Sequence, residues 1–487
     1  MNLQQELKRH FGYETFRAGQ EETITSILDG CDTLSMLPTG TGKSLCYQLP
    51  GQLLDGQVLI VSPLLSLMQD QVEQMKVNGE KSVIALNSFL TYQEKAWALD
   101  HIHRFKFIFV SPEMMKSEAF RTAASRIRVG LFVIDEAHCI SQWGPDFRPD
   151  YLDLGEARER LGMPVTLALT ATATRTVRDD IREVLRMEGA AELVHSVDRK
   201  NIGLFVRNVE DDRHKRDEVL SFVERLKGPG IIYFTSKRKA EDVALWLREH
   251  GVEGVAHYHG GMDHEERILI QQQFLSDKLQ IICATSAFGM GVNKENVRFV
   301  VHYHLPSSIE SYLQEIGRAG RDGRESVSLV LYAEQDASIP LQFMHSELPD
   351  DAQIEGAIAA FPSMEWSDII AALQLSDVQS RFLEYYIQSF ARYRSDRMVE
   401  EIKRIRDARI AYKRRNLDSV MGWLHTASCR RQVLLDYFGE ELKDRPERCC
   451  DRCGSDLGEF HGEGVHSYPS LENWADQLKK ILLGSVV

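Results

Sequence analysis

Short apolar runs alternate with helical patterns along the first 200 residues. Apolar runs that end in a small or polar residue are typical of buried parallel strands whose carboxyl ends carry the chemistry of a protein. The pattern starts again after residue 205, which predicts two α/β domains in tandem, joined by SVDRKNIGLFVRN (196–208). The predicted strands are VLIVS (58–62), FIFVS (107–111), LFVID (131–135), TLALT (166–170), GIIYFTS (230–236), LQIICATS (279–286) and VRFVVHYH (297–304).

The strand pattern stops at about residue 336, and the remainder of the chain is predicted to be helical. Residues 349–392 predict three short helices, broken at FPS (361–363) and at QLS (374–376), with Ser367 and Ser376 as N-caps. A long polar helix, rich in arginine, is predicted over residues 396–424.

Composition narrows the class of protein. The 487 residues carry a formal net charge of −14, with 43% hydrophobic and 27% charged residues, which excludes a mainly disordered or fibrous chain. The N-terminal sequence lacks the apolar core of a signal peptide, and no apolar run approaches the length of a membrane span, so we expect a cytoplasmic protein without membrane contact. The acidic balance argues weakly against nucleic acid, although residues 378–431 hold 13 Lys and Arg against 6 Asp and Glu.

The most specific local motif is LPTGTGKSLCYQLP (37–50). Gly40 and Gly42 let the backbone curl so that its N–H groups face phosphate oxygens. Lys43 then reaches the β- and γ-phosphates, and Ser44 ligates Mg²⁺. Leu37 stands where the usual pattern begins with glycine, so a glycine-rich turn of no function is the alternative.

An acidic motif follows a predicted buried strand. The apolar residues LFVI (131–134) lead directly into Asp135 and Glu136. A strand that delivers acids at its tip can hold Mg²⁺ opposite a phosphate loop, with Asp135 contacting the metal through water and Glu136 deprotonating the attacking water. The alternative is an ordinary strand end with two exposed acids.

Two arginines in the second predicted domain complete a nucleotide site. The run QEIGRAGRDG (314–323) places Arg318 and Arg321 one helical turn apart, where both guanidinium groups can reach a γ-phosphate across a cleft. The alternative is a basic pair on the surface.

With these motifs the sequence resembles superfamily 2 helicases, and more narrowly the RecQ family of DNA helicases, over residues 1–335 and 421–453. The stretch FGYETFRAGQ (11–20) resembles the family motif that recognises adenine. The resemblance implies that Tyr13 stacks on the base while Arg17 and Gln20 hydrogen-bond to it. It implies an ATP-binding set of Tyr13, Arg17, Gln20, Thr39, Gly40, Thr41, Gly42, Lys43 and Ser44.

Other stretches resemble the parts of the family that contact DNA. SPLLSLMQDQ (62–71) and VSPE (110–113) resemble DNA-backbone contacts, whereas LTATAT (169–174) and ATSAFGMGVNK (284–294) resemble coupling motifs. DEAHCISQWGPDFRPDY (135–151) resembles the aromatic-rich loop that senses single-stranded DNA, with Trp143, Phe147 and Arg148 as stacking and cationic groups. A loop packed on its own aromatic side chains is the alternative. Pro145 stands where many members of the family carry histidine.

A group of cysteines lies near the C-terminal end. Cys429, Cys449, Cys450 and Cys453 fall within 25 residues, and in a reducing compartment such a cluster indicates a metal site before it indicates disulfides. The segment MGWLHTASCRRQVLLDYFGEELKDRPERCCDRCG (421–454) resembles the RecQ zinc subdomain, which implies structural Zn²⁺ on these four thiolates. His425 is the reserve ligand, and scattered structural thiols are the alternative.

Larger relatives continue past the zinc site with a winged-helix domain, for which the 34 residues that follow here are too few. The helical stretch before Cys429 is longer than in compact members of the family. We expect residues 349–392 either to replace the winged helix as a helix–turn–helix-like module or to serve as a packing scaffold without DNA contact. Arg404, Arg414 and Arg415 on the long helix are expected to reach phosphates.

The fold class expected is therefore α/β, with two tandem RecA-like parallel-sheet domains (1–200 and 201–335), a helical module (336–395), a long helix with a zinc subdomain (396–454) and a tail (455–487). The resemblance implies an ATP-dependent 3′–5′ DNA helicase that uses Mg²⁺ with ATP and acts on single-stranded, tailed or branched DNA. We expect a monomer, associated with the nucleoid if bacterial, with a single-strand-binding protein or other repair factors as partners. A translocase that remodels or anneals DNA with little unwinding is the alternative.

Overall fold

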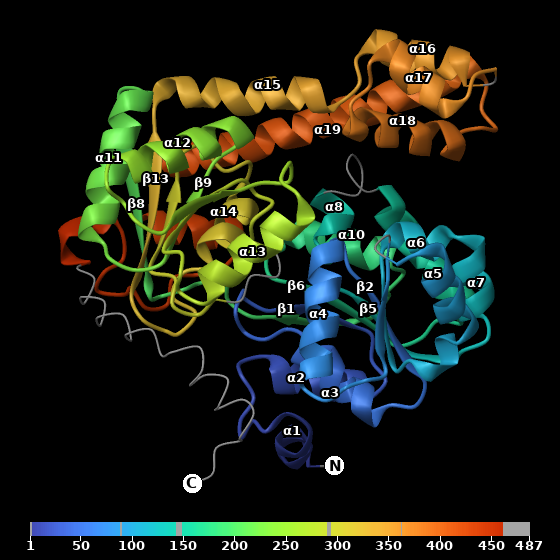
Figure 1. The fold of residues 1–487 in the computed structure, drawn as a ribbon. Coiled ribbons are helices and arrows are strands. Elements are labelled where there is room, and N and C mark those ends of the chain that lie inside the picture. Colours follow the sequence, from blue (N-terminus) through green and yellow to red (C-terminus); the bar gives the residue numbers. More distant parts are fainter. Residues whose placement is uncertain (1, 88–89, 143–148, 290–293, 362, 461–487) are drawn as a thin grey trace.

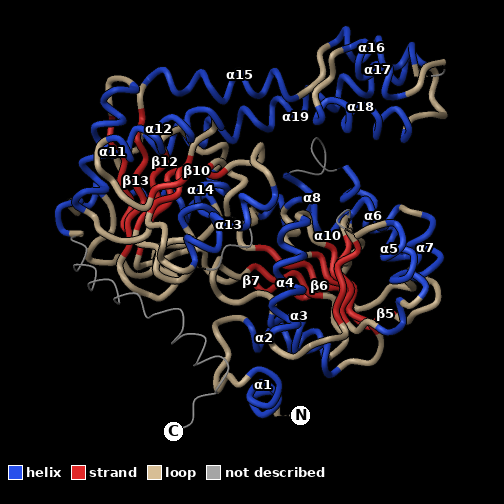
Figure 2. Tube along the Cα trace, viewed as in Figure 1, coloured by secondary structure: helices blue, strands red, loops and turns tan. Residues whose placement is uncertain are grey.

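The computed structural model describes residues 2–87, 90–142, 149–289, 294–361 and 363–460. Two parallel β-sheets, each covered by helices, lie side by side, and a helical region crosses above both of them (Figure 1). The α/β class with two RecA-like domains is thus confirmed. Figure 2 shows that every strand belongs to one of these two sheets, whereas the region that crosses above them is helical.

The first sheet has seven parallel strands in the order β3-β4-β2-β5-β6-β1-β7. Six of the strands are almost wholly buried, which explains their continuous apolar sequences, and β7 lies at the edge with alternating exposure. The strands are β1 (Thr33–Met36), β2 (Gln57–Val61), β3 (Val83–Leu86), β4 (Phe107–Val110), β5 (Val129–Ile134), β6 (Thr166–Thr170) and β7 (Ala191–Val194).

The helices of the first domain cover the two faces of this sheet (Figure 1). They are α1 (Leu3–Phe11), α2 (Gln20–Leu28), α3 (Leu45–Leu53), α4 (Leu65–Val77), α5 (Tyr92–Asp100), α6 (Pro112–Lys116), α7 (Glu118–Ala124), α8 (Cys139–Gln142), α9 (Leu154–Arg160) and α10 (Arg175–Val184).

The second sheet has six parallel strands in the order β10-β11-β9-β12-β13-β8. Its edge strand β8 lies within the stretch 196–208 that the sequence assigned to the connection, because residues 202–208 pair with β13 along its whole length. The strands are β8 (Ile202–Asn208), β9 (Gly230–Tyr233), β10 (Val255–Tyr258), β11 (Ile281–Ala284), β12 (Phe299–His302) and β13 (Ser326–Tyr332), and the helices are α11 (Asp212–Arg225), α12 (Lys237–Glu249), α13 (His264–Leu275) and α14 (Ile309–Ile316).

The C-terminal region is helical, as predicted. The three short helices and the long helix lie where the sequence placed them, and Ser376 caps α18 through a capping box. The prediction for Ser367 was wrong: the N-cap of α17 is Glu365, because Trp366 already lies in the first turn, where its Nε1 donates to Ser380 Oγ (3.0 Å). The helices are α15 (Ser338–Glu347), α16 (Asp351–Ala360), α17 (Trp366–Leu373), α18 (Asp377–Ser389), α19 (Ser395–Leu424) and α20 (Arg430–Tyr437).

Helices α15 and α19 run side by side and carry α16–α18 out to a position above the first domain (Figure 1). We call α16–α18 with the N-terminal part of α19 the helical module, since these elements share a separate apolar core that includes Ile369 and Phe382. The module touches the first domain through α18, where Tyr385 Oη donates to Asp153 Oδ1 (3.2 Å). Lys116 of α6 lies over the Tyr385 ring, 4.7 Å from its centroid.

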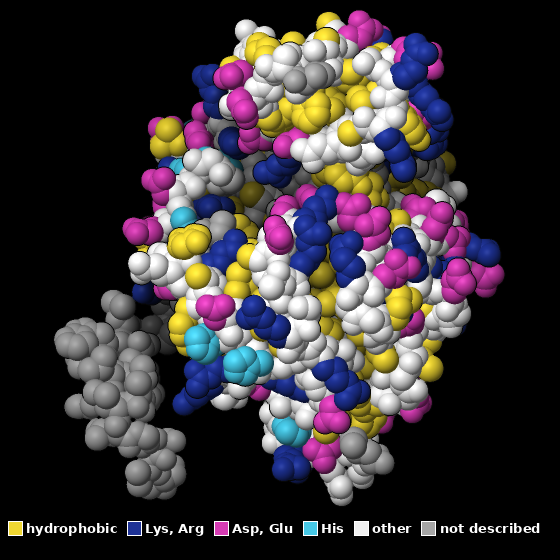
Figure 3. Space-filling view, turned by 90° about the vertical axis from the view of Figure 1, so that its right-hand side faces the viewer, with side chains coloured by type: hydrophobic (Ala, Val, Ile, Leu, Met, Phe, Trp, Pro, Cys, Tyr) yellow, Lys and Arg dark blue, Asp and Glu magenta, His cyan; other side chains and the backbone are white. Residues whose placement is uncertain are grey.

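Basic and acidic side chains are interspersed over the helical module and the first domain when the molecule is viewed from this end (Figure 3). No single sign of charge dominates this face of the described chain. Among the described residues, no helix has both the length and the apolar character that a membrane span requires.

Candidate interdomain nucleotide site

A pocket of about 380 Å³ lies between the two sheet domains. Both domains contribute to its lining, which brings together residues as far apart in the sequence as Phe11 and Arg321. Of the residues singled out in the sequence, the lining includes Tyr13, Arg17, Gln20, Thr39, Gly40, Gly42, Lys43, Ser44, Asp135, Glu136, Arg318 and Arg321.

The phosphate loop connects the end of β1 to the start of α3. Gly40 (φ 91°) and Gly42 (φ 76°) both adopt the left-handed conformation that glycine tolerates, so the loop curls as the sequence predicts. Thr41 Oγ1 donates to Pro38 O (2.8 Å) and closes the turn from within. Gly40 is also a point of close approach, because a Cβ atom there would lie 3.1 Å from Arg321 Cγ.

The acids at the tip of β5 face the phosphate loop. Lys43 Nζ donates to Glu136 Oε1 (3.3 Å), and the backbone N–H of Glu136 donates to Asp135 Oδ1 (3.0 Å). Glu136 has a positive φ of 49°, which is uncommon for a residue with a side chain and typical of functional sites.

The two neighbouring carboxyl groups have pKa values that are shifted apart. Burial and the charge of Glu136 raise the pKa of Asp135 to about 6. Burial also acts to raise the pKa of Glu136, but the charges of Lys43 and His138 outweigh it, so this pKa falls below its ordinary value. Pairs of acids with separated pKa values are typical of catalytic sites.

Arg318 and Arg321 reach the pocket from the second domain. The prediction that the two lie one turn apart on a helix was wrong, since α14 ends at Ile316 and the arginines lie in the turns that follow. Gly320 (φ 57°) lies between them in a conformation that departs from a right-handed helix. Arg318 NH1 donates to Gly289 O. Burial, together with the charges of Arg318 and Arg199, lowers the pKa of Arg321 to about 9. Clustered buried cations of this kind favour the binding of an anion.

The residues expected to recognise adenine also line the pocket. The Tyr13 ring is 61% exposed, which leaves its face open to stacking. Gln20 Nε2 donates to Thr41 O (2.8 Å), and Arg17 NH1 donates to Gly40 O (2.7 Å). The two polar side chains therefore brace the phosphate loop as well as lining the pocket.

The aromatic-rich loop has described residues only at its two ends. Trp143, Phe147 and Arg148, as well as Pro145, lie outside the described residues. On the N-terminal side of the loop, Ser141 Oγ donates to Asp180 Oδ2 (2.6 Å).

The LTATAT motif is joined to the acidic motif through a buried hydrogen bond. His138 Nδ1 lies 3.0 Å from Thr170 Oγ1, and His138 Nδ1 also lies 3.4 Å from Glu136 Oε2. One imidazole ring therefore lies beside both the LTATAT motif and Glu136.

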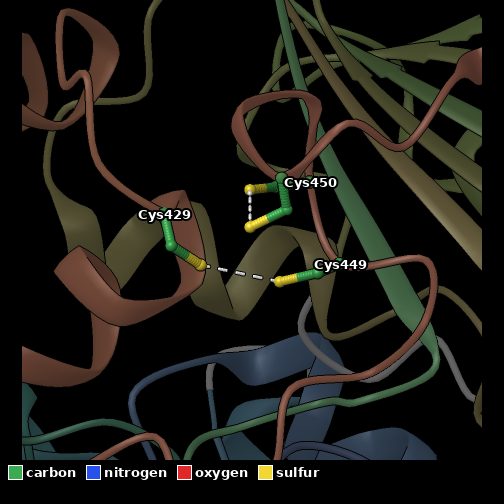
Figure 4. Close-up of side chains that lie close together, drawn as sticks. Cys429, Cys449 and Cys450 are labelled. Atoms are coloured by element: carbon green, nitrogen blue, oxygen red, sulfur yellow. Dashed lines mark hydrogen bonds between the residues drawn. The ribbon is translucent and has the colours of Figure 1, made fainter.

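The four clustered cysteines converge in the structure. Cys429 precedes α20, the other three lie in the loop at 449–453, and all four Sγ atoms lie within 4.8 Å of one another. Figure 4 shows Cys429 and Cys449 pointing toward each other, with Cys450 beside Cys449. The Sγ atoms of Cys429 and Cys449 are 3.6 Å apart and those of Cys450 and Cys453 are 3.5 Å apart, close to the roughly 3.8 Å spacing of thiolates around tetrahedral Zn²⁺.

The donor set fits Zn²⁺ without histidine. The four sulfur atoms by themselves supply the four ligands of a tetrahedral structural zinc site. The proposed reserve ligand His425 lies outside the four-thiol group and packs edge-on against Tyr332, with ring centroids 5.2 Å apart. The zinc loop also extends the second sheet, since the N–H of Leu204 in β8 donates to Cys449 O (3.1 Å).

Several lining residues were not assigned to the pocket from the sequence. Asp70 and Gln71 belong to the stretch 62–71 that resembles a DNA-backbone contact, yet both line the pocket. Gln271 Nε2 of the second domain donates to Asp70 Oδ2 (3.4 Å). Gly289 lies in the stretch 284–294 that resembles a coupling motif. Glu295 lies just outside this stretch and belongs to no motif of the sequence analysis.

The structure thus has two RecA-like domains with a pocket between them. The pocket holds a phosphate loop, paired acids and two arginines, and this combination defines the motor of a helicase. The family models that match are DEAD/DEAH box helicase (residues 17–180), helicase conserved C-terminal domain (214–323) and RecQ zinc-binding (392–454). The chain is 44% identical to the "Probable ATP-dependent DNA helicase RecS" of Bacillus subtilis, over 98% of this chain and 97% of that protein. The chain belongs to the RecQ family of ATP-dependent DNA helicases.

Longer relatives share most of this chain but extend beyond it. The chain is 38% identical to the "ATP-dependent DNA helicase RecQ" of Haemophilus influenzae over 92% of its own length, and the match covers 62% of that protein. Among solved structures, Mycobacterium smegmatis Lhr bound to ssDNA and AMP-PNP superposes with a TM-score of 0.56 at 20% identity, covering 80% of this chain and 57% of Lhr. Saccharomyces cerevisiae Dbp5 bound to RNA and ADP BeF3 gives 0.55 at 19% identity, covering 70% of this chain and 89% of Dbp5. These likenesses show the fold.

Proposed function

We propose that this RecQ-family enzyme is a 3′–5′ helicase that translocates on single-stranded DNA and unwinds tailed or branched duplexes in recombination and repair. The observation that supports this most is the meeting of both domains at one pocket, where the side chain of Arg321 packs against Gly40 of the phosphate loop. Such a pocket converts nucleotide binding and release into closure and opening of the two domains.

ATP would bind with its phosphates on the loop 37–44. Lys43 holds the β- and γ-phosphates, and this replaces its present contact with Glu136. Ser44 and Asp135, the latter through water, would hold Mg²⁺, which supplies charge neutralisation at the phosphate oxygens. Glu136, once released by Lys43, orients and deprotonates the attacking water.

Arg318 and Arg321 stabilise the charge that develops on the transferred phosphoryl group. Tyr13 stacks on the adenine, while Arg17 and Gln20 hydrogen-bond to its edge. The exposed ring of Tyr13 and the position of all three side chains in the lining support this assignment.

DNA would cross both domains, and we assign its sensing to Trp143, Phe147 and Arg148. Support comes from the hydrogen bond between His138 and Thr170, which ties a coupling motif to the acidic motif that precedes this loop. DNA helicases among the relatives, and the printed description of Lhr as bound to ssDNA, are consistent with such a substrate. We keep the domain boundaries at 1–200, 201–335, 336–395, 396–454 and 455–487.

The second candidate function is a DNA-stimulated translocase that remodels or anneals DNA with little unwinding. The docking of the helical module on the first domain through Tyr385 favours it, because a module held in this way is a scaffold rather than a free strand-separating element. A monomeric cytoplasmic protein, associated with the nucleoid in a bacterium and working with a single-strand-binding protein or other repair factors, fits either function.

Strand separation distinguishes the two. Duplexes with a 3′ tail or a 5′ tail are incubated with the enzyme, ATP and Mg²⁺, with Lys43→Ala as the control. Unwinding from the 3′ tail alone, lost in the control, supports the helicase with the stated polarity. DNA-stimulated ATP hydrolysis without unwinding supports the translocase, and unwinding from the 5′ tail contradicts the polarity.

A further inference from the structure

Arg199, in the connection between the two sheets, donates hydrogen bonds to both sides of the interdomain pocket. Its NH1 group donates to Thr39 O of the phosphate loop (3.1 Å) and to Gly317 O of the second domain (3.1 Å). Its NH2 group donates to Ala319 O (3.0 Å) and Gly320 O (2.7 Å). One guanidinium group therefore joins the phosphate loop to the segment 317–322 that carries Arg318 and Arg321, which we call the arginine loop.

The two loops that Arg199 joins are in close contact at the same place. A Cβ atom on Gly317 would lie 3.1 Å from the Cβ of Thr39, and a Cβ atom on Gly40 would lie 3.1 Å from Arg321 Cγ. The four carbonyl groups that accept from Arg199 present partial negative charge to one guanidinium group. A planar cation with several donors in fixed directions satisfies them together, which a lysine with its compact charge does not.

Arg199 is itself held in place from the zinc subdomain. Arg431, two residues after the zinc ligand Cys429, donates to Arg199 O (3.0 Å) and forms an ion pair with Asp198. The side chain of Arg431 is 3% exposed, so this contact is shielded from water. Burial lowers the pKa of Arg199, although Asp322 acts in the opposite direction.

We propose that Arg199 is a positioning residue for ATP hydrolysis, which sets the arginine loop at the separation from the phosphate loop that the reaction needs. The proposal rests on the proposed function, since it acts through Arg318 and Arg321. Without Arg199 the phosphate loop still binds nucleotide through its own backbone and Lys43. The arginine loop, having lost three of its hydrogen bonds and its link to Thr39, samples positions in which the arginines miss the transition state.

The test compares Arg199→Ala and Arg199→Lys with the wild type in the full-length protein. ATP hydrolysis is measured with saturating single-stranded DNA, and the affinity for a fluorescent ATP analogue is measured separately. We expect kcat to fall at least about tenfold in both variants, with analogue affinity within about threefold of the wild type. A lysine variant with full activity overturns the proposal, because charge alone would then suffice.

A double-mutant cycle separates positioning from general stability. If Arg199 acts through the arginine loop, kcat of the double variant should lie within about twofold of kcat of Arg321→Ala alone. Independent effects on kcat would instead multiply. The proposal is overturned if the two effects on kcat multiply. It is also overturned if kcat of Arg199→Ala lies within twofold of the wild-type value. Melting temperature and zinc content confirm that each variant is folded.

Two neighbouring residues provide matched controls. Asn201 Nδ2 donates to Gly320 O (2.8 Å) and Arg324 O (2.8 Å), so Asn201→Ala loosens the arginine loop without touching the phosphate loop. Lys200 forms an exposed ion pair with Asp444 (3.0 Å), and Lys200→Ala is expected to be neutral. A defect in Asn201→Ala as large as that in Arg199→Ala overturns the bridging role. If Lys43→Ala retains ATPase activity, the proposed function itself fails; if Lys43→Ala is inactive and Arg199→Ala is fully active, only the present inference fails.

Discussion

Lys43 and Glu136 of the first domain form an ion pair in the lining of the interdomain pocket, with Nζ 3.3 Å from Oε1. Both side chains are largely buried, so each charge depends on the other for compensation. In the function that we propose, a γ-phosphate would draw Lys43 away and leave Glu136 beside Asp135 without this partner. The loss of the nearby cation would raise the basicity of Glu136 when ATP is bound.

Substitution Glu136→Gln tests this exchange. Glutamine keeps the shape of the side chain but cannot accept a proton, so we expect kcat for ATP to fall by about 10² or more. Lys43 is no longer held by a carboxylate, so the affinity for ATP is expected to be equal or higher. Steady-state hydrolysis and binding of a fluorescent ATP analogue measure the two quantities. Glu188→Gln, at an exposed position of the same domain, is the control, and a Glu136→Gln enzyme with more than a tenth of wild-type kcat contradicts the assignment.

Asp135 is predicted to lower stability at neutral pH. Its pKa of about 6 in the folded protein exceeds the ordinary value of 3.8, so its ionisation is costly when the protein is folded. The destabilisation grows as pH rises from about 4 to 6 and is constant above, where it amounts to about 3 kcal/mol.

Asp135→Asn should therefore raise the melting temperature of the first domain by several degrees at pH 7.5 and by less at pH 5, while hydrolysis is lost. Thermal unfolding at the two pH values measures this difference. A stabilisation that is equal at both pH values, or absent at pH 7.5, contradicts the raised pKa of Asp135.

Removal of one thiolate should release zinc. Cys429→Ser leaves three sulfur ligands, and we expect zinc content to fall from about one ion per chain to a small fraction, with a lower melting temperature. Metal analysis of the purified protein and thermal unfolding measure both effects. Cys31→Ser, at an exposed cysteine far along the chain, and His425→Ala should keep their zinc. Loss of zinc from His425→Ala contradicts the four-cysteine set.

The arginines of α19 give a prediction about salt. Arg404, Arg414 and Arg415 are exposed, and changing all three to glutamine should lower the slope of log K against log salt for single-stranded DNA by about 2, at roughly 0.7 per phosphate contact. Binding titrations at several salt concentrations measure the slope. An unchanged slope means that these arginines do not contact phosphates.

A matched control lies on the same helix. Lys403 pairs with Asp351 (3.1 Å) and Glu355 (2.6 Å), and Arg406 pairs with Asp351 (2.7 Å). Lys403 and Arg406 are less exposed than Arg404 and pair with acids of another helix, α16. Lys403→Gln with Arg406→Gln should therefore leave the slope unchanged. An equal loss of slope in this double variant points to a general effect of charge on the helix.

The sequence located seven of the thirteen described strands and missed β1, β3, β7, β8, β10 and β13, of which β8 and β13 are seven residues long. Strand β1 contains Thr33 and Ser35, both fully buried, which an apolar pattern does not predict. Their hydroxyl groups are satisfied by helix α2, since Ser35 pairs with Thr23 and Thr33 pairs with Ser26, each at 2.8 Å. The partners lie on another element, so only packing shows that these positions can be buried.

Local chemistry was determined by the sequence alone. The phosphate loop and the acids after β5 are contiguous motifs whose geometry follows from backbone rules at neighbouring residues. The four cysteines lie within 25 residues, and the structure brings the members of each motif together. The family resemblance rested on the same contiguous stretches.

The tertiary structure alone decided which distant groups meet. It joined Arg321 to Gly40 and Arg199 to Thr39, docked Tyr385 on Asp153, and placed Arg318 and Arg321 in turns rather than on a helix. The four hydrogen bonds from Arg199 to backbone carbonyl groups leave no pattern in the sequence, because every residue offers the same carbonyl group. Such contacts depend on how two sheets pack, and packing is a property of the whole chain.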